Sequence, residues 1–275
     1  MEADDTPTAD PYTPIEIRCY FVRKRNCLAV RGQFAPLFVD YYLHLASNHL
    51  QVTQFQDGIL KDGLVALTLH LASRPWKEHH AWTIHFQRPM VNLFLCGDNT
   101  TSKVVGRTFD RDVKDVQRNM FFSQVIESHS HEPRTSAVEF EGNNVFRAAE
   151  QFYTQSEQRL GRIFDYGDED YVMVSAQPEC DEAWLESLTA EAVRDIDKTE
   201  ELSLLETRVY HFECGCSEPR IWEVLAPHCT NGAADLFENE EQLQVSCRRC
   251  GAQYRILREQ FEAYLESRTA RRTRD

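Results

Sequence analysis

The sequence contains no long apolar run and no excess of positive charge. Its longest apolar stretch, "GLVALTLHLAS" (63–73), includes His70 and is too short to cross a bilayer. The 275 residues carry 30 Lys and Arg against 44 Asp and Glu, which gives a formal net charge of −14. Nucleic-acid-binding surfaces are basic because they must match phosphate. We therefore expect neither a membrane nor a nucleic acid as a partner.

The first residues also lack the features of an export signal. "MEADDTPTADPYTP" (1–14) is acidic and proline-rich, with neither a basic start nor an apolar segment. We therefore expect a cytoplasmic protein in which residues 1–14 form a disordered tail. Thiols are kept reduced in the cytoplasm, so clustered cysteines indicate metal or redox chemistry rather than fixed disulfides. The odd total of nine cysteines also disfavours a fully paired scaffold.

Catalytic motifs are missing as well. The sequence has no glycine-rich phosphate loop, no Gly-x-Ser-x-Gly motif and no His-x-x-x-His pair. The deaminase combination of His-x-Glu with Pro-Cys-x-x-Cys is also absent. The composition, 42% apolar and 11% aromatic, is nevertheless sufficient for a folded core. We therefore expect a folded protein that is not an enzyme.

Two close pairs of cysteines are the strongest chemical signal in the chain. Cys214-Gly215-Cys216 and Cys247-Arg248-Arg249-Cys250 are separated by 30 residues. Both spacings allow two thiolates to face one ion, and four thiolates in a tetrahedron form a structural zinc site. The pattern predicts one zinc ion bound by Cys214, Cys216, Cys247 and Cys250. Iron–sulfur ligation is less favoured by this spacing. Cys229, between the pairs, is expected to be a small buried apolar residue, with a spare ligand or a resolving thiol as the alternative.

Hydrophobic periodicity predicts an α+β fold for most of the chain. "DGLVALTLHLA" (62–72) has apolar residues at helical spacing, whereas "AWTIHF" (81–86) alternates as a half-buried strand does. "TSAVEF" (135–140) predicts another strand, and Asn144 is placed to cap the helix that follows. "YVMVSAQP" (171–178) predicts a strand that ends near its proline.

The distribution of these elements and of the cysteines predicts three parts and a tail. We assign residues 15–180 to an N-terminal domain of mixed strands and helices, 181–208 to a helical linker, 209–266 to a small four-cysteine zinc module and 267–275 to a basic tail. Within the module, Ser217 is placed to cap a short helix, and "LQVSC" (243–247) and "QYRIL" (253–257) predict two strands.

Other short stretches accompany the cysteine pairs in a consistent order. Arg220 follows the first pair, and Gly251 and Tyr254 follow the second. Upstream stand "VRGQF" (30–34), "FYTQSEQ" (152–158) and "VMVSAQP" (172–178). Together these features resemble the heat-shock protein 33 family of redox-regulated molecular chaperones, over about residues 15–262.

The resemblance implies an N-terminal substrate-binding domain, a helical linker and a C-terminal zinc switch. Cys214, Cys216, Cys247 and Cys250 would be both zinc ligands and redox sensors. In such proteins the reduced, zinc-bound form is largely inactive. The oxidised form has the disulfides Cys214–Cys216 and Cys247–Cys250, releases zinc, partly unfolds and forms a homodimer. It then holds unfolding client proteins without ATP.

The sequence departs from the family pattern at two places. The interval between "TEEL" (199–202) and Cys214 is much shorter than is usual, and this interval is where the family's linker unfolds. "FQRPMVNL" (86–93) stands where the family has a glycine-rich turn.

Two other functions fit the same cysteine pattern. The first is a zinc-stabilised adaptor that binds one partner constitutively and whose thiols do not respond to oxidants. The second is a zinc-ribbon nucleic-acid binder, which Arg248 and Arg249 favour and the net charge disfavours.

Overall fold

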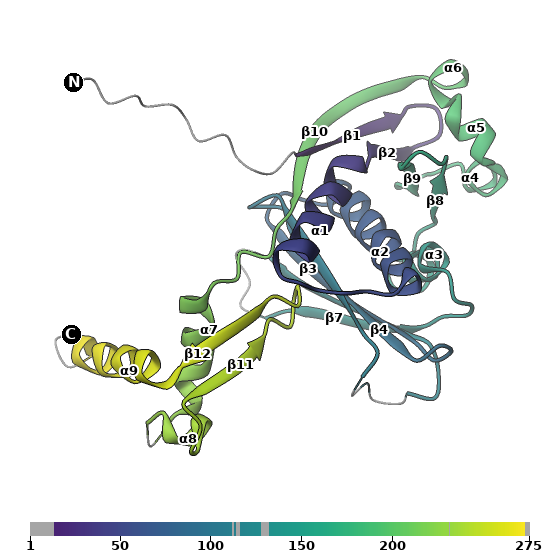
Figure 1. Cartoon of the computed structure of the whole chain (residues 1–275). Helices are drawn as coiled ribbons and strands as arrows, with labels where there is room; N and C mark the ends of the chain where they lie inside the picture. The colour runs from purple at the N-terminus through teal and green to yellow at the C-terminus, as the bar shows by residue number, and fades with distance from the viewer. Residues whose placement is uncertain (1–13, 112, 114–115, 128–131, 231, 273–275) are drawn as a thin grey trace, which may run out of the picture. The chain divides into compact units, whose positions relative to one another are not determined.

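The computed structural model describes residues 14–111, 113, 116–127, 132–230 and 232–272 (Figure 1). The chain divides into two compact units. One comprises residues up to 45 together with 51–213, and the other comprises residues 46–50 together with 214 onward. Except for Pro14, the expected N-terminal tail lies outside the described residues. All four cysteines of the predicted zinc module lie in the second unit.

The described strands of the first unit form one long mixed sheet. They are β1 (Ile15–Val22), β2 (Cys27–Gln33), β3 (Glu78–Phe86), β4 (Val91–Asp98), β5 (Lys103–Phe109), β6 (Met120–Glu127), β7 (Arg134–Glu139), β8 (Gly161–Asp165), β9 (Asp170–Ala176) and β10 (Leu202–Phe212). Their order is β7-β6-β3-β4-β5-β10-β1-β2-β9-β8. β10 pairs with β1 along most of its length but meets β5 through only two parallel residue pairs. It therefore joins two antiparallel halves, β8-β9-β2-β1 and β5-β4-β3-β6-β7.

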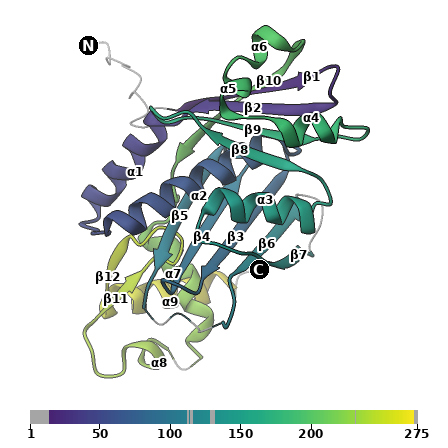
Figure 2. The same ribbon diagram turned by 90° about the vertical axis from the view of Figure 1, so that its right-hand side faces the viewer.

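Helix α2 (Gln54–Ala72) lies between the two halves of the sheet (Figure 2). It contacts β4 and β5 as well as β1, β2 and β9, which explains why its residues from Leu64 to Ala72 are all buried. Gly63 allows this close packing, because a Cβ there would lie 2.7 Å from the Leu93 side chain. Thr53 and Gln56 form a capping box that starts the helix. Two other helices of this unit are α1 (Ala35–Ser47) and α3 (Val145–Gln155).

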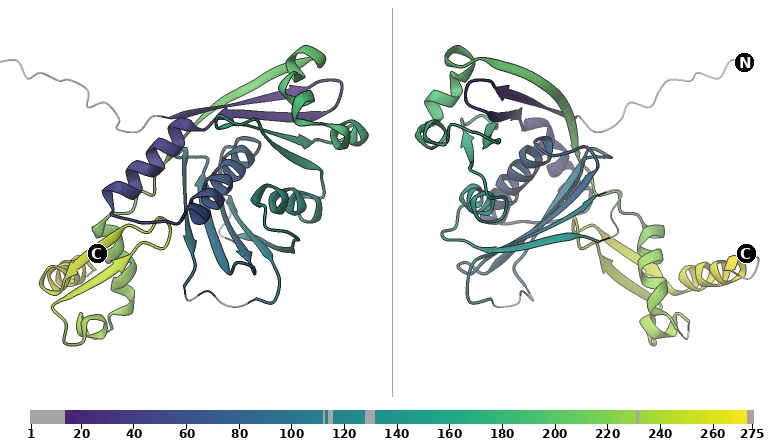
Figure 3. Two further views of the ribbon diagram at one scale, coloured as in Figure 1. Left: turned by 45° about the vertical axis from the view of Figure 1, so that its right-hand side comes forward. Right: turned by 180° about the vertical axis from the view of Figure 1, so that it is seen from behind.

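Three short helices cover one face of the β8-β9-β2-β1 half (Figure 3). They are α4 (Glu182–Ser187), α5 (Ala190–Arg194) and α6 (Ile196–Thr199), and we call residues 182–199 the covering segment. Leu185, Val193 and Ile196 from this segment pack against Val172 and Val174 of β9. Because alternate residues of a strand point to opposite faces, β9 is buried on both sides, by α2 and by the covering segment.

The second unit has a small apolar core. Its elements are α7 (Glu218–Leu225), a 3₁₀ turn (Ala226–His228), α8 (Ala234–Phe237), the hairpin of β11 (Gln242–Ser246) and β12 (Gln253–Leu257), and α9 (Arg258–Arg272). The fully buried side chains of its core cluster are Ala226, Ala233, Phe237, Ile256 and Phe261. So few buried apolar side chains provide little stability for a unit of this size.

Several sequence-based predictions are confirmed. The fold is α+β, the periodic stretch 62–72 lies in α2, and the alternating stretch 81–86 lies in β3. Residues 135–139 belong to β7, and the Asn144 side chain accepts a hydrogen bond of 2.9 Å from the Arg147 backbone N–H to cap α3. Residues 243–246 and 253–257 form the predicted hairpin.

No helix among the described residues has the length and apolarity needed to span a membrane.

The predicted helical linker, 181–208, is wrong in its second half. Residues 202–208 belong to β10, and the second unit begins at Cys214 rather than at residue 209. Leu202 and Leu205 are spaced as residues on one face of a helix are, so their spacing alone favours a helix there. The pairing of β10 with β1 and β5 selects the strand, and Arg208, Tyr210 and Phe212 are buried at the two-residue period of a strand.

Two smaller expectations also differ from the structure. Helix α9 runs to Arg272, so residues 267–272 of the expected basic tail are helical. Ser217 precedes α7 as predicted, but its side chain makes no capping hydrogen bond there. At the second departure from the family pattern, "FQRPMVNL" (86–93) contains the turn between β3 and β4, which are interior strands of the sheet.

We predict that the covering segment depends on a few buried contacts. Leu185→Ala removes a side chain with no exposed surface and is expected to lower the free energy of unfolding by about 2–5 kcal/mol. Leu205→Ala is the matched control, since Leu205 is 56% exposed, and it is expected to change stability by less than about 0.5 kcal/mol. Urea denaturation of the reduced protein measures both changes. Equal effects of the two substitutions would contradict the buried role of Leu185.

Candidate metal centre

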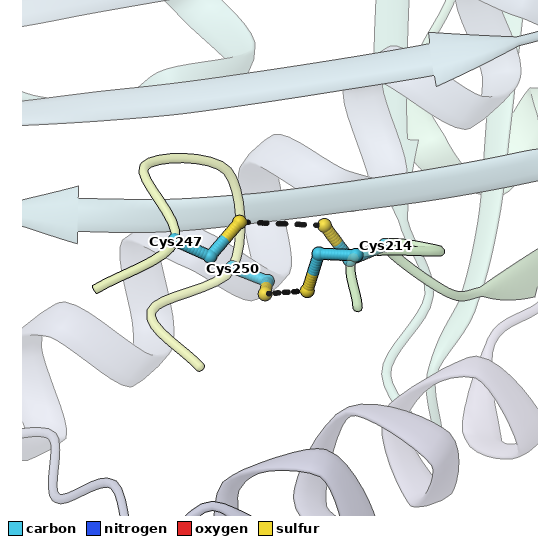
Figure 4. Close-up of side chains that lie close together, drawn as sticks. Cys214, Cys247 and Cys250 are labelled. Atoms are coloured by element: carbon cyan, nitrogen blue, oxygen red, sulfur yellow. Dashed lines mark hydrogen bonds between the residues drawn. The ribbon is translucent and has the colours of Figure 1, made fainter. Parts of the chain in front are cut away.

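The four cysteines of the sequence motif converge on one point of the second unit. The Sγ atoms of Cys214, Cys216, Cys247 and Cys250 all lie within 4.8 Å of one another. The Cys214 and Cys247 sulfurs are 3.7 Å apart, and those of Cys216 and Cys250 are 3.5 Å apart (Figure 4). Both short contacts join a cysteine of the first pair to a cysteine of the second. The cluster therefore connects the two ends of a stretch of more than 30 residues.

Two left-handed glycines shape the backbone around the sulfurs. Gly215 has a φ of +64° and lies between the first two cysteines, while Gly251 has a φ of +84° and follows Cys250. Such values are costly for residues with a Cβ but not for glycine. In the second turn, the Gly251 N–H donates to the Cys247 carbonyl at 2.9 Å, and the Cys247 N–H donates to the Ala252 carbonyl at 2.7 Å. These bonds fold the turn so that both of its sulfurs face the same side.

Side chains next to the cluster hold the first pair in place. The Arg220 guanidinium donates a hydrogen bond of 2.6 Å to the Gly215 carbonyl. The Tyr254 hydroxyl, on β12, donates one of 3.0 Å to the Cys216 sulfur. Cys214, Cys247 and Cys250 are buried, whereas Cys216 is half-buried. The cluster is therefore largely shielded from water, with one sulfur at its accessible edge.

The thiols polarise one another. Hydrogen bonding with Cys214, and also with Cys250 and Tyr254, lowers the pKa of Cys216 to about 7. Hydrogen bonding with Cys214, Cys216 and Cys250 lowers the pKa of Cys247 as well. The pKa of Cys214 is raised because its hydrogen bonds with Cys216, Cys247 and Cys250 favour the protonated form. Part of the cluster thus ionises readily, and thiolates are the form that binds metals.

The positions of the sulfurs fit one tetrahedral metal ion. Bonds of about 2.3 Å to four thiolates place neighbouring sulfurs about 3.8 Å apart. The two shortest sulfur–sulfur contacts, 3.7 and 3.5 Å, are close to this distance. Because all four sulfurs lie within 4.8 Å of one another, metal binding requires only small shifts of the sulfur positions. The four cysteines are therefore positioned to bind a metal ion. All four protein ligands are supplied by cysteine, which leaves no open position for a substrate.

Cys229 does not join the cluster. Its half-buried side chain packs against the apolar core of the second unit, with its sulfur 3.8 Å from the Leu225 carbonyl oxygen. The group of metal-ligating side chains found among the described residues does not include it. Cys229 is therefore not a ligand of the four-cysteine cluster.

Sequence reasoning missed a second close pair of sulfurs, in the first unit. The Sγ atoms of Cys27 and Cys180 are 3.2 Å apart although the two residues are 153 positions apart in the sequence. Neither residue stands in a recognisable motif, and only the pairing of β2 with β9 brings them together. No spacing rule could have found this pair.

Comparisons with known proteins agree with the resemblance seen in the sequence. Residues 165–257 match the model of the Hsp33 protein family. The chain is 24% identical over 267 residues to the 33 kDa chaperonin of Proteus mirabilis, covering 82% of this chain and 88% of that protein. The crystal structure of a 33 kDa chaperonin, a heat shock protein 33 homologue from Thermotoga maritima, matches with a TM-score of 0.68. That match is 13% identical and covers 94% of this chain and 99% of the other. The resemblance to heat-shock protein 33 is confirmed, and the structural match establishes a shared fold.

We predict that metal binding requires the four-cysteine cluster. Elemental analysis of the reduced, purified protein is expected to find about one metal ion per chain. Cys250→Ser is expected to remove most of it, because an alcohol is a poor substitute for a thiolate. Cys229→Ser changes a cysteine outside the cluster and is expected to retain the metal. Full metal content in the Cys250→Ser variant would contradict the assignment.

Proposed function

We propose that this protein is a redox-regulated, ATP-independent holdase chaperone of the cytoplasm. In its reduced form, Cys214, Cys216, Cys247 and Cys250 bind one zinc ion and the protein is inactive. Oxidation forms disulfides, releases the zinc and unfolds part of the chain. The convergence of four sulfurs within 4.8 Å carries this proposal, and the similarity to chaperonins supports it. The activity is binding rather than catalysis.

Zinc and the disulfides differ in which parts of the chain they connect. A zinc ion ties the first cysteine pair to the second, and structural zinc contributes roughly 10–16 kcal/mol of apparent folding free energy. A disulfide within either pair closes a loop of only a few residues, which contributes about 2 kcal/mol by the chain-entropy relation. Oxidation within the pairs thus removes far more stability than it returns. The small core of the second unit cannot offset this loss.

Unfolding of the second unit exposes apolar surface. Phe237, Ile256 and Phe261 lose their cover, together with the half-buried Trp222 and Tyr254. Exposed apolar surface of this kind binds the exposed apolar surface of unfolding proteins. Clients of the oxidised form are therefore unfolded or aggregation-prone proteins, and the same surface can join two oxidised copies into a homodimer.

The segment before the first ligand is the next part to lose its order. Cys214 follows β10 after a single intervening residue, and two residues separate β10 from the covering segment. Release of this stretch uncovers Val172 and Val174 of β9 and frees Leu185, Val193 and Ile196. Because β10 is paired with β1, zinc release alone is insufficient to free it. We therefore propose that activation needs an oxidant together with mild heat, or a strong oxidant such as hypochlorous acid.

We predict that oxidation switches the chaperone activity on. After peroxide with mild heat, or hypochlorous acid, a chromogenic chelator is expected to detect about one released zinc per chain. The oxidised protein is expected to suppress light scattering by a chemically denatured client, while the reduced protein does not. Cys229→Ser is the control and is expected to behave as wild type. Unchanged light scattering of the client in the presence of oxidised, zinc-free protein would contradict the proposal. A constitutive adaptor would retain its zinc in mild oxidant and would not suppress the scattering.

We also predict that the disulfides form within the pairs, Cys214–Cys216 and Cys247–Cys250. The fragment 221–248 bears both Cys247 and Cys229, so the Cys229→Ser variant is used for mapping. In this variant trypsin cuts after Arg248 and Arg249, and the fragments bearing Cys247 and Cys250 stay joined only through the disulfide between those two residues. The fragment 209–220, which bears the first pair, is expected to be released alone. Mass spectrometry without reduction distinguishes these products. A fragment 209–220 joined to Cys247 or Cys250 would contradict the switch, because disulfides across the pairs close loops of more than 30 residues and preserve the tether.

A further inference from the structure

The sulfurs of Cys27 and Cys180 form a second thiol pair, in the first unit. Their Sγ atoms are 3.2 Å apart. Cys27 is the first residue of β2 and is fully buried, whereas Cys180 is half-buried in the loop between β9 and α4. One member of the pair is thus accessible from water, and the other is directly behind it.

The backbone holds the two cysteines together on both sides. The Gln177 N–H donates to the Asn26 carbonyl at 3.0 Å, and the Asp181 N–H donates to the Arg25 carbonyl at 3.0 Å. Between these bonds, the Cys180 N–H donates to the Gln177 carbonyl at 3.0 Å and closes a turn. Pro178 and Glu179 fill that turn, and Glu179 has a φ of +63°, as the third residue of a type II turn requires. The turn returns the chain over the start of β2.

The same place is where the covering segment is attached to the sheet. Arg25 donates to the Asp181 carboxylate at 2.7 Å and to the Glu200 carboxylate at 3.0 Å, so it binds residues at both ends of the segment. Its guanidinium also lies 5.3 Å from the centre of the Trp184 ring. The Asn26 side chain donates to the Glu179 carbonyl at 3.0 Å. The sulfur pair is therefore at the anchor point of the covering segment.

We propose that Cys27 and Cys180 form a disulfide when the protein meets hydrogen peroxide, and that this bond fastens the start of the covering segment to β2. It is a redox site separate from the four-cysteine cluster. A disulfide has an S–S length of about 2.05 Å, so the two sulfurs need to approach by about 1.2 Å. The hydrogen bonds on both sides keep the pair in register for this approach.

The exposure of the two thiols assigns their roles. Peroxide meets the accessible Cys180 first, oxidises its sulfur to a sulfenic acid and leaves as one water. The Cys27 sulfur then attacks the Cys180 sulfur, so that an S–S bond forms and the S–O bond breaks. The departing hydroxide takes the Cys27 proton and leaves as a second water. Burial, followed by the hydrogen bond with Cys180, raises the pKa of the Cys27 thiol, so Cys27 is the less readily oxidised of the two by peroxide.

The disulfide sets a limit to unfolding. Residues 181–213 lie between Cys180 and the first ligand of the metal centre, Cys214. With the disulfide closed, the covering segment can detach only from its C-terminal end and stays tethered at residue 180. This consequence rests on the proposed function, whereas formation of the disulfide does not.

Peptide mapping tests the disulfide directly. The full-length protein is treated with peroxide until thiol loss stops, and the remaining thiols are alkylated in denaturant before tryptic digestion. Cys27 lies in the fragment 26–31 and Cys180 in the fragment 163–194, and the two are expected to be joined. Recovery of both fragments separate and alkylated overturns the proposal, as does attachment of either to another cysteine. Released zinc and client scattering, measured on the same sample, show separately whether the proposed function holds.

Hydrogen exchange tests the tether. In oxidised wild type, amides of the covering segment are expected to exchange about tenfold more slowly than in oxidised Cys180→Ala. Cys19→Ala, which truncates a buried cysteine of β1, is the matched control and is expected to behave as wild type. In the three reduced proteins, amides of the covering segment are expected to exchange at the same rate. This comparison controls for any effect of the side-chain truncation itself on exchange. Equal exchange in the three oxidised proteins overturns the tether.

Discussion

The order of the C-terminal unit depends on one interaction, the convergence of four cysteine sulfurs within 4.8 Å. Two of the sulfurs come from a turn next to β10 and two from the turn of the β11–β12 hairpin. The rest of the unit is a small apolar core that includes Phe237 and Phe261. A metal ion bound at this point would contribute more to the free energy of folding than that core does, and in our proposal oxidation of the cysteines releases it. In our proposal the unit is therefore stable only while these cysteines are reduced.

The stretch from residue 181 to residue 213 connects this chemistry to the large sheet. Its helices cover one face of β9, and its strand β10 joins the two halves of the sheet. A cysteine stands at each end: Cys180 before it, paired with Cys27, and Cys214 after it, in the metal centre. In our proposals, oxidation loosens the C-terminal end of this stretch and fastens its N-terminal end. The same oxidant then both releases apolar surface and limits how far the sheet is disrupted.

The sequence alone was sufficient to predict the four-cysteine cluster, because Cys-x-Cys and Cys-x-x-Cys spacings impose local geometry on their sulfurs. It was also sufficient for α2 and for the Asn144 cap of α3, which follow from periodicity and local capping. It was insufficient for β10, where Leu202 and Leu205 suit a helix and only pairing with β1 selects the strand. The Cys27–Cys180 contact could not be predicted from the sequence either, since it depends on the register of β2 with β9. Long-range pairing explains both failures.

Hydrogen exchange over residues 214–266 of the reduced protein, with and without a metal chelator, tests the dependence of the second unit on its metal most directly. We predict that removal of the metal increases exchange throughout α7, the β11–β12 hairpin and α9 together, while α2 and β3–β6 of the first unit remain protected. A metal-free, reduced protein in which residues 214–266 keep their full protection would contradict the account.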